Sequence, residues 1–293
     1  MFNIESILQS PKDKGPLQHG EGQYKDASGN TYPITHGVAD FLLEVDEFVH
    51  AEDHLGEVMD EGHPDHVMQQ WNESKDHFWN QFLEQEKELK GKTVLYIGSG
   101  LDEAFMRFAD QHVSLINVDV AEKLLEQLKE KGAEHCIRAD ISTLPFVDGS
   151  VDYIVMIDLL HHFATRSMDP TTKELVRVLK PGGKMYIQEI NRFGLFRLPI
   201  AWAPLFILNR LRGLKGLYKK DYHRPESYEA PISTTTVKRS LRKAAAIEFK
   251  TISTPQYPEV NSIFLFIWKL VRHVPFVQKY CGYHWYLVAT RKS

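Results

Sequence analysis

The residues best suited to chemistry follow a short apolar segment, 93–97, which runs into Gly98-Ser99-Gly100. Glycines at the end of a strand let the backbone approach a ligand, and the N-terminus of a following helix offers N–H groups and a positive dipole end. Asp119 stands nineteen residues after Gly100, at the end of the next apolar segment. An acidic residue at that place can accept hydrogen bonds from both hydroxyls of a ribose. The pattern therefore predicts a nucleoside or nucleotide site.

The rest of the turn disfavours a dinucleotide. The third glycine of the dinucleotide pattern is replaced by Glu103. Asp102 and Glu103 also add negative charge where a diphosphate requires neutral or positive surroundings. A cationic or zwitterionic nucleoside fits better, and S-adenosylmethionine carries a sulfonium, an amine and a carboxylate but no phosphate.

The elements that must hold these residues alternate between strand and helix from Lys92 onward. We expect strands at 93–97, 113–118, 136–138, 153–157 and 185–190, and helices at 104–111, 121–131 and 171–179, with a turn at Pro181-Gly182-Gly183. A helix at 234–246 and strands at 247–253 and 284–291 complete the pattern. This order predicts an α/β protein with a doubly wound, parallel sheet.

Further motifs follow the glycine turn in a fixed order. They are Val118-Asp119, Arg138-Ala139-Asp140-Ile141 with Leu144-Pro145-Phe146, Val151-Asp152-Tyr153-Ile154-Val155, Leu160-His161-His162-Phe163 and Leu179-Lys180-Pro181-Gly182-Gly183. With them, the stretch from Thr93 to about Glu189 resembles the class I S-adenosylmethionine-dependent methyltransferases of the small-molecule (type 11) sort. The resemblance implies a Rossmann-like, doubly wound sheet of seven strands, mostly parallel, with 284–291 as the antiparallel last strand.

The resemblance also implies S-adenosyl-L-methionine as the cofactor and a set of residues that bind it. These are Gly98, Ser99 and Gly100 for the methionine and ribose portion, Asp119 and Val120 for the ribose, Asp140 and Ile141 for the adenine, and Asp158 and Leu159 at the methyl-transfer cleft. As an alternative, Asp140 and Asp158 are caps at strand ends.

His161 and His162 are the candidate catalytic residues. Methyl transfer from a sulfonium mainly requires alignment of the nucleophile and exclusion of water. A hydroxyl or phenol acceptor also needs a base, which either histidine could provide, although packing is the alternative role. The segment Asp158-Leu159-Leu160-His161 lacks the Asn/Asp-Pro-Pro-Tyr pattern of nucleobase methylation. The sequence shows no metal triad, so we expect no metal.

The chain departs from the family pattern at two positions of the first motif. Tyr96 stands where the family has an acidic residue that supports the methionine amine, and Asp102 stands where it has a small one. Asp102 could reach that amine or repel the methionine carboxylate, and the sequence leaves both open.

Residues 1–44 resemble a small zinc ribbon, which occurs fused to some methyltransferases and as a separate activator of tRNA and release-factor methyltransferases. The ribbon's cysteine pairs would fall at Ser10 and Asp13 and at about Lys25 and Ser28. These side chains cannot supply the ligands that structural zinc requires. We therefore predict a degenerate, metal-free ribbon. Residues 45–91 should form a linker and a cap helix, and residues 92–293 the methyltransferase domain, with helical cap insertions at 193–233 and 254–283.

Composition limits the possible partners. The 293 residues include only two cysteines, which excludes a disulfide scaffold. Their net charge of −4 argues against DNA and RNA as partners. The most apolar stretch, 198–208, is too short to span a bilayer. We expect a soluble, cytoplasmic protein. The basic segment 191–230 leaves peripheral membrane contact as an alternative.

The aromatic residues of the two insertions predict a small hydrophobic or aromatic methyl acceptor. Two other functions stay open, a non-catalytic protein that binds S-adenosylmethionine or acts as a scaffold, and an RNA methyltransferase. The departures at Tyr96 and Asp102 motivate the first, and the ribbon with the basic segment motivates the second.

Overall fold

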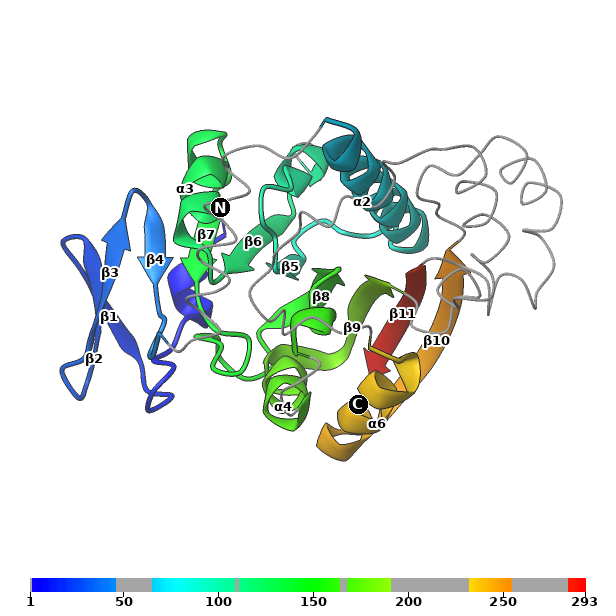
Figure 1. Ribbon diagram of the computed structural model, residues 1–293. Helices are drawn as coiled ribbons and strands as arrows, with labels where there is room; N and C mark the ends of the chain where they lie inside the picture. The colour runs from blue at the N-terminus through cyan, green and yellow to red at the C-terminus, as the bar shows by residue number, and fades with distance from the viewer. Residues whose placement is uncertain (1, 46–64, 109–110, 164–167, 191–231, 255–283) are drawn as a thin grey trace, which may run out of the picture.

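A computed structural model describes residues 2–45, 65–108, 111–163, 168–190, 232–254 and 284–293 (Figure 1). The predicted linker and almost all of both predicted insertions lie outside these residues.

The centre of the molecule is a twisted sheet of seven strands that carries the predicted motifs (Figure 1). In chain order they are β5 (Thr93–Ile97), β6 (Ser114–Asp119), β7 (His135–Arg138), β8 (Val151–Ile157), β9 (Leu179–Ile190), β10 (Ile247–Thr254) and β11 (His284–Arg291). Their spatial order is β7-β6-β5-β8-β9-β11-β10. The strands from β5 to β9 pair in parallel, whereas β11 pairs antiparallel with both β9 and β10. The order reverses beside β5, where doubly wound sheets bind their ligands.

The predicted count of seven strands is too low, because the sheet continues into the N-terminal segment. β1 (Leu17–Gly20), β2 (Gln23–Asp26), β3 (Thr31–Thr35) and β4 (Val38–Asp40) form an antiparallel meander. β4 then pairs in parallel with β7, so the described sheet has eleven strands. The meander covers the edge of β7, whose backbone groups would otherwise lack partners. We call residues 2–45 the N-terminal module.

The helices agree with the predicted ones in place but not always in length. They are α2 (Asp65–Gln85), α3 (Glu122–Glu130), α4 (Met168–Val178) and α6 (Thr234–Ala244), with 3₁₀ turns η1 (Ile4–Ile7), η2 (Ala104–Phe108) and η3 (Leu160–Phe163). In the described part of the helix predicted over 104–111, residues 104–108 form the 3₁₀ turn η2. α2 lies in the range predicted to hold a linker and a cap helix, and it ends at Gln85. The predicted glycine turn at 181–183 lies within β9, where the pairing with β8 shifts register.

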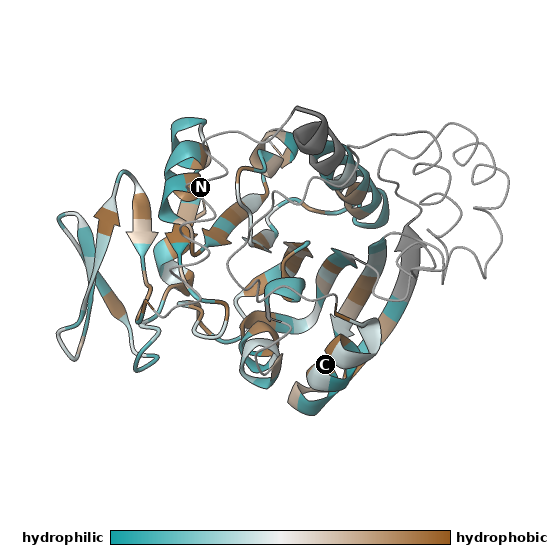
Figure 2. Cartoon of the chain, in the orientation of Figure 1, coloured by the Kyte–Doolittle hydropathy of each residue, from teal (hydrophilic) through white to brown (hydrophobic). Residues whose placement is uncertain are grey.

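Both faces of the central sheet are covered, which explains why all five residues of β5 are buried. Val94 and Tyr96 face a core that includes Phe78 and Phe82 of α2. Leu95 and Ile97 face the opposite core, to which α4 and α6 contribute. Figure 2 shows the strands of the centre mainly in the colours of apolar residues, with polar residues on the outer helix faces.

Within the described part of the chain, no helix has the length and apolar character needed to cross a membrane.

Candidate functional site

The glycine turn after β5 lies against the segment that follows β8. Gly98 and Gly100 have φ angles of 69° and 51°, in the left-handed region that favours glycine. A Cβ atom at Gly98 would stand 2.7 Å from Leu159 Cδ1. The Gly98 N–H donates to the Val118 carbonyl at 2.8 Å, which ties the turn to β6. The backbone conformation therefore favours glycine at both positions, and at Gly98 a side chain would also displace Leu159.

Asp119, the last residue of β6, joins the two loops at this edge of the sheet. Its Oδ2 accepts a hydrogen bond from the Gly100 N–H at 2.9 Å, and its Oδ1 accepts one from the Ala121 N–H at 3.0 Å. Asp119 therefore bonds to the backbone of both the turn after β5 and the loop after β6. The carbonyl of the next residue, Val120, accepts a hydrogen bond from Arg138 Nε at 2.9 Å.

Asp140 follows β7, and its side chain forms hydrogen bonds with a residue two positions further along the chain. Its Oδ1 accepts hydrogen bonds from the backbone N–H, at 2.6 Å, and from the hydroxyl of Ser142. The Asp140 carbonyl also accepts from the Thr143 N–H at 3.0 Å. Asp140 therefore caps a turn, in line with the alternative role considered for it, while Ile141 beside it is buried. Contact of this pair with an adenine stays a prediction.

Asp158, directly after β8, adopts a φ of 51°, which is uncommon for a residue other than glycine. Its N–H donates to the Gln188 carbonyl at 2.9 Å, and its Oδ1 lies 3.3 Å from His284 Nε2. Burial by itself would raise the pKa of Asp158, but His284 and the positive charges beyond it hold that pKa below its usual value. The residue at this end of β8 is therefore an ionised carboxylate beside an imidazole.

His161 lies on η3 and contacts a buried carboxylate that the sequence analysis missed. Its Nδ1 lies 3.0 Å from Oε2 of Glu189, which is fully buried on β9. The other Glu189 oxygen accepts from the Leu160 N–H. A carboxylate on Nδ1 favours the tautomer protonated there and leaves Nε2 as the basic nitrogen. The only sequence signal for Glu189 was a polar pair, Gln188-Glu189, at the end of an apolar strand.

His162 stacks loosely on its neighbour, since the ring centroids of His161 and His162 lie 4.2 Å apart. The structure thus brings both predicted histidines to the end of β8, beside Asp158.

Tyr96 and Asp102, the two departures from the family pattern, contact each other. Asp102 Oδ2 accepts hydrogen bonds from the Tyr96 hydroxyl at 2.8 Å and from Trp79 Nε1 at 2.9 Å. Trp79 packs edge-on against Tyr96 at 5.2 Å between centroids. Burial and the Asp102 charge raise the pKa of Tyr96 well above its usual value. A carboxylate of the loop after β5 therefore lies within hydrogen-bond distance of the hydroxyl of Tyr96.

Several buried polar atoms at this edge have no hydrogen-bond partner among the described residues. They include the Oγ of Ser99 and the Oε1 of Gln188, whose side chains are both fully buried. The amide nitrogen of Gln188 donates to Ser74 Oγ of α2 at 3.0 Å. Unpaired buried polar atoms cost free energy, so a ligand that supplies partners to Ser99 and Gln188 would be favoured at this edge.

These features fit S-adenosylmethionine. A glycine turn allows close approach, Asp119 can receive ribose hydroxyls, and the carboxylates of Asp102 and Asp158 suit a cationic ligand rather than a diphosphate. Within the described ranges, no cluster of three or more His, Cys, Asp or Glu residues could hold a metal ion.

The predicted zinc-ligand positions of the N-terminal module form a hydrogen-bonded cluster instead. Asp26 Oδ2 accepts from the hydroxyls of Ser10 and Tyr32, both at 3.0 Å, and from Asn30 Nδ2 at 2.8 Å. At the position expected at about Lys25, Lys25 itself is exposed, whereas its neighbour Asp26 is buried. We call these four bonded residues, Ser10, Asp26, Asn30 and Tyr32, the Asp26 cluster.

The other two predicted ligand positions are also joined to each other. Ser28 Oγ donates to Asp13 Oδ2 at 3.0 Å, and the Asp13 N–H donates to Ser10 Oγ at 3.3 Å. Hydrogen bonds therefore connect the loops that cysteine pairs would hold in a zinc ribbon.

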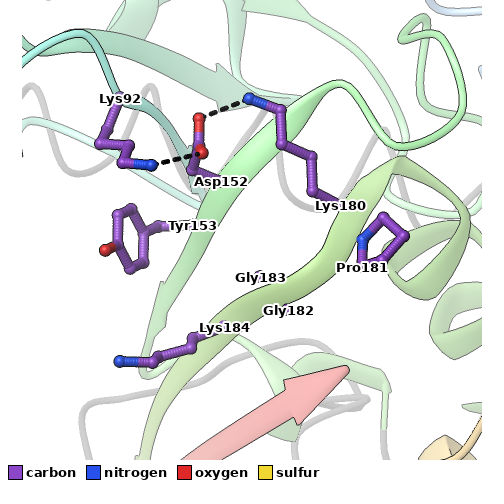
Figure 3. A pocket seen from close by; sticks show the side chains of 8 residues that line it. All are labelled: Lys92, Asp152, Tyr153, Lys180, Pro181, Gly182, Gly183 and Lys184. Atoms are coloured by element: carbon purple, nitrogen blue, oxygen red, sulfur yellow. Dashed lines mark hydrogen bonds and ion pairs between the residues drawn. The ribbon is translucent and has the colours of Figure 1, made fainter. Parts of the chain in front are cut away.

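A shallow pocket lies at the opposite ends of β8 and β9 (Figure 3). Asp152 pairs there with Lys180 at 2.7 Å and with Lys92 at 3.3 Å. Burial opposes the charge of Asp152, but bonds from Lys180 and the Thr93 N–H lower its pKa. The lysines of this pocket are engaged in ion pairs, and none of the predicted cofactor-binding or catalytic residues lines it, so we assign it no role.

Comparison with known proteins agrees with this geometry. Residues 95–187 match the model of the Methyltransf_11 family, described as a methyltransferase domain. This match, together with the fold, supports a class I S-adenosylmethionine-dependent methyltransferase domain and S-adenosylmethionine as its cofactor.

Among curated proteins, the chain is similar to the human protein named probable tRNA methyltransferase 9B, with 33% identity over 108 residues, 36% of this chain and 23% of that one. It is 28% identical to ubiquinone biosynthesis O-methyltransferase of Xanthomonas oryzae pv. oryzae over 155 residues, 49% of this chain and 61% of that one. Demethylmenaquinone methyltransferase of Renibacterium salmoninarum is 26% identical over 144 residues, 47% of this chain and 56% of that one. The chain thus spans less than two thirds of the length of each.

Among solved structures, the chain resembles one from the complex between the Haloferax volcanii Trm112 methyltransferase activator and a methyltransferase. The TM-score is 0.53 with 16% sequence identity, and the match covers 85% of this chain and 99% of that one. At this identity the likeness concerns the fold alone.

Proposed function

We propose that this protein transfers a methyl group from S-adenosylmethionine to a hydroxyl group of a small hydrophobic or aromatic molecule. The observation that carries the proposal is the contact of His161 with the buried Glu189, beside the glycine turn and Asp119. The names of two relatives, which describe methylation in the biosynthesis of quinones, support an acceptor of this chemical class.

S-adenosylmethionine, when bound, supplies a methyl group activated by the positive charge on sulfur. Asp119 would accept hydrogen bonds from its ribose hydroxyls, while the turn of Gly98, Ser99 and Gly100 would contact the ribose and methionine portion. Ile141 would flank the adenine, with Asp140 near its amine. These residues would fix the reacting methyl group in place, which is most of what this displacement requires.

Asp102 would face the methionine amine rather than repel the cofactor. The Tyr96 hydroxyl and Trp79 Nε1 both donate to Asp102 Oδ2, so this oxygen is fixed and the carboxylate stays at the turn. A carboxylate held in this way attracts an ammonium group more strongly than a mobile one on the surface.

His161 would act as the general base. Glu189 holds Nδ1, so Nε2 would take the proton from the acceptor hydroxyl as the oxygen attacks the methyl group. The resulting imidazolium would form beside a buried carboxylate, which stabilises its charge. His162 is the second candidate for this role, and Asp158 and Leu159 would line the cleft.

Two measurements on the full-length protein test the proposal. Titration calorimetry with S-adenosylmethionine should give a dissociation constant in the micromolar range, and no binding at high micromolar ligand would contradict it. Labelled methyl transfer to simple phenols and catechols should then appear in an organic extract. The variant His161→Gln should lower the transfer rate about a hundredfold, the lower range of general-base effects, while cofactor affinity stays unchanged.

The same assay separates the alternatives. The relatedness to a protein named tRNA methyltransferase favours RNA as a second candidate acceptor. Label that enters added tRNA but not the phenols would support that function and reject the small-molecule acceptor. Cofactor binding with transfer to neither acceptor, nor to any metabolite of a cell extract, would support a non-catalytic binding protein.

A further inference from the structure

The junction between the N-terminal module and the central sheet contains a side chain that reaches the cofactor loop. Arg138 is the last residue of β7, and its side chain is only 9% exposed. Asp40, the last residue of β4, is its partner in the parallel ladder (Figure 1). The Phe41 N–H also donates to the Arg138 carbonyl at 2.8 Å. The pairing of β4 with β7 therefore sets Asp40 beside Arg138.

The Arg138 guanidinium bridges the module and the loop between β6 and α3. Its Nη1 donates to Asp40 Oδ2 at 3.1 Å, and its Nε donates to the Val120 carbonyl at 2.9 Å. Nη1 also lies 3.4 Å from Oε2 of Glu122, at the start of α3. Asp40 is itself held, because its Oδ1 accepts from the Leu42 N–H at 2.9 Å. The planar guanidinium thus has fixed partners on both sides.

The loop that Arg138 holds is the one that carries Asp119. Val120 follows Asp119 directly, and the Ala121 N–H donates to the Asp119 carboxylate. On the other side, the Ala139 N–H donates to the Asp119 carbonyl at 3.1 Å. A shift of the Val120 carbonyl would therefore change the direction of the Asp119 carboxylate.

We propose that Asp40 and Arg138 are positioning residues for the ribose end of the cofactor site, so that the N-terminal module is a working part of that site. This inference depends on the cofactor assigned under the proposed function. Without Asp40, Arg138 Nη1 still has the carboxylate of Glu122 within reach, and the Glu122 side chain is 37% exposed. The guanidinium would turn toward Glu122, and the Val120 carbonyl would lose its donor.

The test measures binding of S-adenosylhomocysteine and of methylthioadenosine, which lacks the amino-acid part, by calorimetry on the full chain. Asp40→Ala should weaken both ligands by the same factor, about five- to tenfold, because both carry the ribose. Asp40→Glu should restore most of the affinity. Asp102→Ala, at the methionine end, should weaken S-adenosylhomocysteine but leave methylthioadenosine unchanged.

Lys14→Ala is the matched control. Lys14 Nζ pairs with Glu174 Oε2 of α4 at 3.2 Å, so this ion pair also joins the module to the rest of the chain but does not contact the cofactor loop. Its removal should leave both affinities within about twofold of the wild type, the range expected for an exposed ion pair.

Several outcomes would overturn the inference. If Asp40→Ala lowers the melting temperature while both affinities stay at the wild-type value, Asp40 only fastens the module. If Lys14→Ala weakens binding as much as Asp40→Ala, any loosening of the N-terminal module lowers the affinity and Asp40 has no specific role. If Asp40→Ala does not fold, Asp40→Asn, which keeps the acceptor for the Leu42 N–H, provides the same comparison. If the wild type binds neither ligand, the proposed function fails together with the inference. If the wild type and Asp40→Ala bind both ligands with the same affinity, only the inference is rejected and the proposed function stands.

Discussion

The Asp26 cluster of the N-terminal module and the carboxyl edge of the central sheet both contain buried polar side chains, but the hydrogen bonding of these side chains differs. In the Asp26 cluster, the Ser10 hydroxyl donates to Asp26 and accepts from the backbone of the turn that follows it. At the sheet edge, the equally buried Ser99 hydroxyl has no partner among the described residues. A buried polar group that is fully bonded stabilises a fold, whereas one that lacks a partner costs free energy. The comparison leads us to expect that the Asp26 cluster serves stability, whereas the carboxyl edge of the sheet serves binding.

The strongest test of the binding region is the variant Asp119→Ala. We expect its affinity for S-adenosylmethionine to fall about a hundredfold, because two hydrogen bonds to a charged acceptor are lost. Asp119→Asn, which keeps the shape, should recover part of the loss. Titration calorimetry checks this, and unchanged affinity would show that the ribose does not contact Asp119.

Ser10→Ala tests the stabilising region. The change leaves Asp26 and Tyr32 without one buried partner, so it should lower the free energy of unfolding by about 1–3 kcal/mol. Denaturant titration measures this loss. Cofactor affinity should stay unchanged. A weaker affinity would show that the Asp26 cluster also contributes to binding.

The pH dependence of stability should also come from the Asp26 cluster. Burial by itself would raise the pKa of Asp26, but hydrogen bonds from Asn30, Ser10 and Tyr32 lower it to about 2 from the usual 3.8. Because the folded state holds the ionised form, the stabilisation is complete above about pH 4 and is lost as the pH falls toward 2.

Other carboxylates titrate in the same pH range, so the melting temperature of a variant is compared with that of the wild type at each pH. The melting temperature of Asp26→Asn should lie several degrees below that of the wild type at pH 6, and the gap should narrow as the pH falls to 2. A gap that does not change with pH would show that the charge of Asp26 is unimportant.

Ser99→Ala should have the smallest effect, and its sign should be opposite to that of Ser10→Ala. Removing a buried hydroxyl without a partner should leave stability unchanged or raise it by up to about 1 kcal/mol. The same denaturant titration measures both variants. A loss comparable to that of Ser10→Ala would mean that the two regions do not differ.

The order of strands and helices was predictable from local patterns, because burial on both faces gives β5 to β9 their apolar runs and the intervening helices their apolar stripes. Errors occurred where local signals compete. The stretch 104–111 has a helical composition, yet its described residues Ala104–Phe108 form a 3₁₀ turn rather than an α-helix. The extra four strands were expected as a separate module, because no local pattern shows that β4 pairs with β7.

The sequence by itself determined that the glycine turn, Asp119 and the two histidines follow strands, and it indicated the chemical class of the cofactor. These predictions depend only on residue type at a fixed place beside a strand. Only the tertiary structure decided which side chains work together. It brought Asp102 to Tyr96, Glu189 to His161, and Asp40 to Arg138, 98 positions apart in the chain. The physical reason is that periodicity reports which face of an element is buried, whereas the partner of a buried charge depends on how distant elements pack.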